Sequence, residues 1–86
     1  MVLEYQINSP EGLHARPATR LVKLASTFVG NIQLEYNGKL VNMKSMLMVL
    51  SLGIPKGATF KIHLDGLKEE DMKNVIEAAL REEALI

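Results

Sequence analysis

The chain has 86 residues, with ten basic and ten acidic side chains, two histidines and no cysteine. This length predicts a single domain spanning residues 1–86, and a hydrophobic content of 48% is enough to form a core. The lack of cysteine excludes disulfides and thiolate metal sites, and two histidines are too few to suggest zinc, so we expect no metal site. We also expect no cofactor. A net charge of zero and only two Phe and two Tyr argue against nucleic-acid binding.

The first residues of the sequence and its apolar runs indicate the cellular location of the protein. The first ten residues, MVLEYQINSP, lack the basic and apolar regions of a secretory signal. The longest apolar run, MLMVL, is far too short to span a bilayer. We therefore expect a cytoplasmic protein that does not insert into membranes.

The first half of the chain changes from a strand pattern to a helix pattern. Residues 3–8 alternate between apolar and polar, which predicts a half-buried strand, and Pro10 and Gly12 then end it. Residues 17–28 carry apolar side chains at helical spacing. Gly30 follows the last of them as a helix stop.

The second half repeats this change twice. Alternation predicts a strand over residues 32–36, and Asn37-Gly38 indicates a tight hairpin into a short strand over 39–42. A short helix is predicted over 45–52 and a strand over 60–65. The last helix begins after Gly66 with three acidic residues, and its predicted buried stripe is Met72, Val75, Ile76, Ala79 and Leu80.

The order of these elements is β-α-β-β-α-β-α. An antiparallel sheet whose helices all pack on one face buries every apolar face in this order. The sequence thus predicts an α+β fold, a two-layer open-faced β-sandwich.

The stretch EGLHARPAT, residues 11–19, lacks a good capping residue at the start of the first helix. Pro17 suits the first helical position and disfavours a helical conformation at Arg16, so we expect Arg16 to be the N-cap. Because an arginine side chain cannot accept hydrogen bonds, the backbone N–H groups of Ala18 and Thr19 should be free for a phosphate. The guanidinium of Arg16 adds a donor fork suited to phosphoryl oxygens.

His14 lies beside these donors. The positive end of the helix should favour a neutral ring, and a neutral imidazole can accept a phosphoryl group. An ordinary surface histidine remains an equal alternative on these residues alone. Glu11 is expected to be a solvated loop charge.

Ser45 precedes the short helix and is a good N-cap, which is its simplest role. A phosphate at the same place would also suit the helix dipole. The five apolar residues that follow cover the whole helix circumference, so some must face solvent. We expect Met46, Leu47 and Leu50 to form an exposed apolar docking surface, with Ala15 and Thr19 beside it.

Two stretches, GLHARPAT and KSMLMVLSLGIPKGATF, closely resemble the histidine-containing phosphocarrier (HPr) family of the bacterial phosphoenolpyruvate-dependent sugar phosphotransferase system. The resemblance covers essentially the whole chain. It implies a four-stranded sheet in the order 1-4-2-3 with three helices on one side. It also implies that enzyme I phosphorylates His14 on Nδ1, that Arg16 stabilises the phosphate, and that the group passes to sugar-specific IIA domains for carbohydrate uptake.

The same resemblance implies regulation at Ser45. In many members an ATP-dependent serine kinase, or kinase/phosphorylase, modifies the matching serine, and the product acts as a corepressor partner of a catabolite-control transcription regulator. Met48 stands where many members have glycine or a polar residue, which bears on partner preference. We expect a monomeric carrier that is not itself an enzyme.

Two other functions stay open. A purely regulatory adaptor would act through Ser45 and the apolar helix, but relatives of that kind lack the phosphorylatable histidine. A nucleic-acid or small-ligand module on a similar sandwich is disfavoured by the charge and the few aromatic residues.

Overall fold

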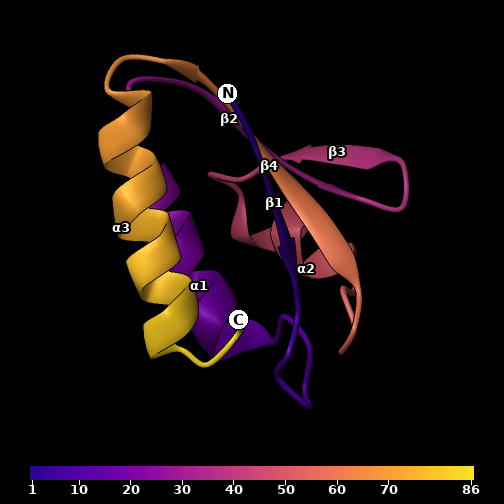
Figure 1. Cartoon of the computed structure of the whole chain (residues 1–86). Helices are drawn as coiled ribbons and strands as arrows, with labels where there is room; N and C mark the ends of the chain where they lie inside the picture. Colours follow the sequence, from indigo (N-terminus) through magenta and orange to yellow (C-terminus); the bar gives the residue numbers. More distant parts are fainter.

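Four strands form one antiparallel sheet in the order β1-β4-β2-β3, and three helices pack against one of its faces (Figure 1). The computed structural model describes residues 1–86. Its elements are β1 (Val2–Gln6), α1 (Ala15–Ala25), β2 (Gly30–Tyr36), β3 (Lys39–Asn42), α2 (Met46–Ser51), β4 (Thr59–Gly66) and α3 (Glu69–Glu82). The predicted two-layer α+β fold and strand order are confirmed.

The alternating pattern of the strands sets which side chains face the helices. Ile62 on the central strand β4 lies between Leu3 of β1 and Leu34 of β2, and all three are buried. Lys61, one residue earlier, faces the open side of the sheet and lies opposite Glu4 on β1 and Glu35 on β2 in the strand register. One face of the sheet is therefore apolar and covered, as alternation requires.

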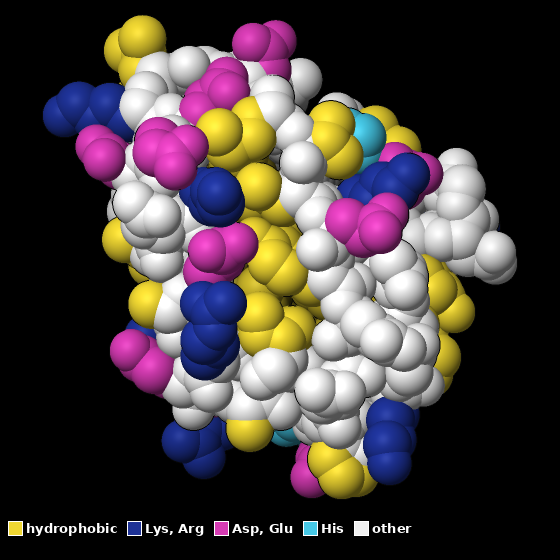
Figure 2. Space-filling model, in the orientation of Figure 1, with side chains coloured by type: hydrophobic (Ala, Val, Ile, Leu, Met, Phe, Trp, Pro, Cys, Tyr) yellow, Lys and Arg dark blue, Asp and Glu magenta, His cyan; other side chains and the backbone are white.

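The core is a single cluster of 21 buried hydrophobic residues between the sheet and the helices. Figure 2 shows charged side chains of both signs along α3 and apolar surface visible between α3 and the sheet. The predicted stripe of α3 is correct except at Val75, which is 43% exposed. Val75 lies at the margin of the stripe, beside the loops that precede β2 and α3.

Two local predictions have different outcomes. The hairpin at Asn37-Gly38 is confirmed, with φ of 53° and 80° at the two residues. α1 ends at Ala25 and not at Phe28, because Thr27 and Phe28 donate to carbonyls three residues earlier and leave the α-helical pattern. Phe28 is nevertheless buried, as its apolar spacing indicated. None of the helices combines the length and apolar character needed to cross a membrane.

Candidate functional site

α1 begins two residues earlier than predicted. His14 is the N-cap, with extended backbone at φ −91° and ψ −178°, and Ala15 is the first helical residue. Pro17 is then third in the helix, still within the first turn, where its missing N–H costs nothing. Pro17 and Ala18 are both buried, and this packing outweighs the conformational bias that proline imposes on Arg16.

The free backbone donors at this helix start are therefore different from those predicted. Ala18 donates its N–H to the His14 carbonyl at 3.1 Å, so the prediction of a free amide there is wrong. Thr19 lies deeper still, where helix geometry directs its amide at the Ala15 carbonyl, which its hydroxyl also contacts at 2.8 Å. The N–H groups of Ala15 and Arg16 have no acceptor, and the His14 side chain does not cap them.

Both ring nitrogens of His14 face oxygen atoms. Nδ1 lies 3.0 Å from the Gly12 carbonyl oxygen, and Nε2 lies 3.5 Å from a carboxylate oxygen of Glu11. The short contact to a carbonyl assigns a hydrogen to Nδ1 in this arrangement. The His14 side chain is 35% exposed, so it is neither enclosed in the core nor fully solvated. Glu11, expected to be only a solvated loop charge, faces the ring.

The loop that carries His14 is fixed against the segment that follows α2. Gly12 has φ +66°, and a Cβ added there would lie 2.3 Å from the Ile54 carbonyl oxygen. Leu13 donates its N–H to that same oxygen at 2.9 Å. Only glycine fits this backbone conformation and this close approach. Gly12 therefore determines the path of the loop and, with it, the position of His14.

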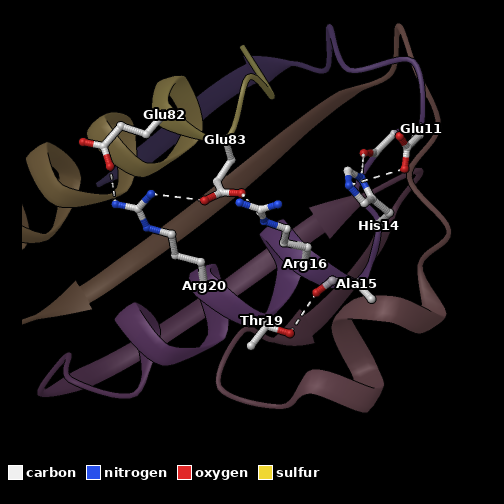
Figure 3. A network of polar contacts seen from close by, with 9 residues as sticks. Glu11, His14, Ala15, Arg16, Thr19, Arg20, Glu82 and Glu83 are labelled. Atoms are coloured by element: carbon white, nitrogen blue, oxygen red, sulfur yellow. Dashed lines mark hydrogen bonds and ion pairs between the residues drawn. The ribbon is translucent and has the colours of Figure 1, made fainter.

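Arg16 and His14 point in different directions (Figure 3). The guanidinium of Arg16 is directed at Glu83, just beyond the end of α3, with Nε 3.7 Å from Oε1. The Arg16 side chain is 87% exposed, while that of Glu83 is only 18% exposed. The predicted phosphate-stabilising group thus lies next to a carboxylate, away from the imidazole.

A second arginine completes this cluster, and the sequence analysis missed it. Arg20 donates to Glu82 at 2.5 Å and to Glu83 at 3.2 Å (Figure 3). The hydrogen bonds to Glu82 and Glu83 raise the pKa of the guanidinium above its ordinary value. The available signal was the spacing of Arg16 and Arg20, because residues four apart share one helix face.

Ser45 is the N-cap of α2, as predicted. Its hydroxyl oxygen accepts a hydrogen bond from the Met48 backbone N–H at 3.3 Å. The structure thus shows the structural role of Ser45, and its modification stays a prediction.

The exposed apolar side chains of α2 differ from the prediction at one position. Leu47 is 80% exposed and Leu50 39% exposed, as expected, but Met48, at 44%, takes the place of Met46. Met46 is half-buried against the core, and its sulfur lies 3.9 Å from the Thr19 hydroxyl on α1. This contact places α2 beside the first turns of α1. We call Leu47, Met48 and Leu50 the apolar patch.

Comparisons with known proteins agree with this fold and motif. The sequence model described as "PTS HPr component phosphorylation site" matches residues 2–82. The structure is similar to a Mycoplasma histidine-containing phosphocarrier protein, at 35% identity and a TM-score of 0.95, covering 100% of this chain and 98% of that one. It is also similar to phosphocarrier protein HPr from Bacillus anthracis str. Ames, at 33% identity and a TM-score of 0.82, covering 92% and 94%.

A third similar structure is a catabolite repression protein. Crh from Bacillus subtilis is 32% identical, with a TM-score of 0.72, and the match covers 95% of this chain and 94% of that one. Crh is described as a domain-swapped dimer. Our expectation of a monomer therefore stays a prediction.

Proposed function

Because this chain belongs to the HPr family of phosphotransferase-system phosphocarriers, we propose that His14 receives a phosphoryl group from phospho-enzyme I and passes it to sugar-specific IIA components. The single observation that supports this best is the half-exposed imidazole at a helix start where no side chain caps the first amides. A phosphoryl group on this ring would lie beside two free N–H donors, those of Ala15 and Arg16.

The transfer exchanges one bond for another. A ring nitrogen of His14 uses its lone pair to form an N–P bond as the bond between phosphorus and enzyme I breaks. The attacking nitrogen must first be without its proton. Family membership favours Nδ1, which faces the Gly12 carbonyl, so its proton must leave. Nε2 can hold the proton of the neutral ring there, where the Glu11 carboxylate can accept its hydrogen bond.

This role makes the chain a covalent intermediate between two enzymes and not an enzyme that turns over a substrate itself. The carrier would act in the cytoplasm and serve carbohydrate uptake into the cell. The apolar patch on α2 would dock enzyme I and the IIA components, since it lies next to the start of α1 and exposes adaptable side chains. Ala15 and Thr19 would contribute to the same docking surface.

Incubation with phosphoenolpyruvate and enzyme I tests the proposal. The protein should become a phosphoprotein that is labile to acid and stable to base, and His14→Ala should abolish the labelling. The variant should stay folded, because the ring is not part of the buried core. Equal labelling of the variant would show that His14 is not the acceptor.

A second function rests on Ser45. Its hydroxyl caps α2 directly beside the apolar patch, so a phosphate there would add charge at the docking surface. We propose that a serine kinase uses ATP to modify it, and that the product can bind a catabolite-control transcription regulator. Incubation with ATP and such a kinase should label wild type and His14→Ala equally and leave Ser45→Ala unlabelled. Labelling of Ser45→Ala would reject this site.

A further inference from the structure

Four charged residues form a cluster at the start of α1 and the end of α3: Arg16, Arg20, Glu82 and Glu83. Of these, only Arg16 has entered the proposed function, through its backbone N–H. The cluster joins the first turns of α1 to the end of α3 and lies next to the loop that carries His14 (Figure 3). Two arginines meet the same carboxylate, that of Glu83, but their contacts differ. Arg20 donates a hydrogen bond at 3.2 Å, whereas Arg16 approaches only to 3.7 Å, too far for a hydrogen bond.

Glu83 is well suited to hold an arginine. Its side chain is 18% exposed, so its charge is less screened than that of a fully solvated carboxylate. Arg20 occupies part of its hydrogen-bonding capacity and is fixed in turn by Glu82. Arg16 therefore meets a carboxylate that is already partly neutralised, which explains a close but loose contact.

We propose that Glu83 holds Arg16 away from His14 in the unphosphorylated protein, and that Arg20 weakens this hold enough for Arg16 to move to the phosphoryl group. Glu83 and Arg20 are then positioning residues with opposite effects. Glu83 competes with the phosphoryl group for Arg16, and Arg20 moderates that competition. The inference rests on the proposed function, because it assumes that His14 carries a phosphoryl group.

The opposite signs give a sharp test. In Glu83→Gln the competing charge is lost, so the equilibrium of phosphoryl transfer from phospho-enzyme I should shift toward the phosphorylated protein. In Arg20→Met the freed carboxylate can hold Arg16 more tightly, so the equilibrium should shift the other way. Methionine preserves much of the aliphatic stem and limits the loss of packing. Each shift should be about two- to fivefold, the range of exposed ion pairs.

Two further variants separate positioning from simple structural support. Glu82→Gln removes a partner of Arg20 that does not contact Arg16, so its equilibrium should stay close to that of wild type. The double variant Arg20→Met/Glu83→Gln should behave like Glu83→Gln, since Arg20 acts through Glu83. The Arg16 Nε–H resonance, followed by NMR, should shift on phosphorylation in wild type and already be shifted in unphosphorylated Glu83→Gln.

The outcomes distinguish the inference from the function on which it rests. If Glu83→Gln and Arg20→Met change the equilibrium in the same direction, or leave it unchanged while wild type is phosphorylated, the inference is wrong and the cluster only joins the helices. If wild type takes up no phosphoryl group from phospho-enzyme I, the proposed function fails and the inference fails with it.

Discussion

α1 and α2 both begin after a residue with extended backbone, at φ −91° for His14 and φ −105° for Ser45, but only one of these two side chains acts as a cap. Ser45 accepts a hydrogen bond from within its own helix. His14 caps nothing, and the two amides after it stay free. The first two amides lack an acceptor in both helices, so the difference lies at the third residue, where α2 has an amide that Ser45 satisfies and α1 has Pro17, which has no N–H. The start of α1 therefore needs no side-chain cap, and its N-cap position is left to the imidazole that we propose as the phosphoryl acceptor. Three predictions test this comparison of α1 and α2, from the largest expected change in stability to the smallest.

The position of the loop that leads into α1 depends on Gly12. Gly12→Ala should lower the free energy of unfolding by about 2–4 kcal/mol, because the new Cβ would meet the Ile54 carbonyl in a left-handed backbone conformation. Urea denaturation measures this change. Gly53→Ala, beyond α2, is the matched control: it also has positive φ but no atom within 4 Å, so it should cost only about 1–2 kcal/mol. Equal losses would show that the close approach at Gly12 does not matter.

The capping difference can be reversed at both helices. Ser45→Ala should cost about 1 kcal/mol of stability, because the Met48 amide loses its acceptor. His14→Ser should be more stable than His14→Ala by about 0.5–1 kcal/mol, because a hydroxyl could cap the free amides of α1. Thermal unfolding of the four proteins, wild type included, measures both effects. No gain in His14→Ser would mean that the start of α1 cannot accept a cap.

The smallest change in stability is expected at the apolar patch. Leu47→Glu should alter the free energy of unfolding by less than about 0.5 kcal/mol, since Leu47 is 80% exposed. It should weaken binding to enzyme I several-fold, measured by calorimetry. Leu67→Glu is the matched control, an exposed leucine between β4 and α3, and should bind as wild type does. Equal affinities for both variants would remove the patch from the docking surface.

The helices and strands were predictable because they depend on local patterns, whereas the strand order was implied by the resemblance to the HPr family. Alternation placed Leu3, Leu34 and Ile62 on one face of a sheet, and helical spacing placed Ile76 and Leu80 in the core. Errors arose where packing competes with a local preference. The conformational bias before proline predicted that α1 begins at Pro17, but burial of the first turn extends the helix back to Ala15.

The positions of the candidate site residues relative to their helices were predictable, but their contacts were not. Gly12, His14 and Ser45 are close to their helices in sequence, so their positions follow from local rules. The direction of Arg16 depends on Glu83, 67 residues later, and no local pattern indicates that pairing. The prediction of an exposed Met46 in place of Met48 was wrong for a similar reason, because the contact with α1 decides which side of α2 is covered.

The hydrogen bond from Leu13 to the Ile54 carbonyl ties the segment before α1 to the segment after α2. These two parts of the surface therefore cannot shift independently when a partner arrives. In the phosphoryl carrier proposed here, each partner would meet a surface that is already ordered, so little conformational freedom would be lost at each encounter.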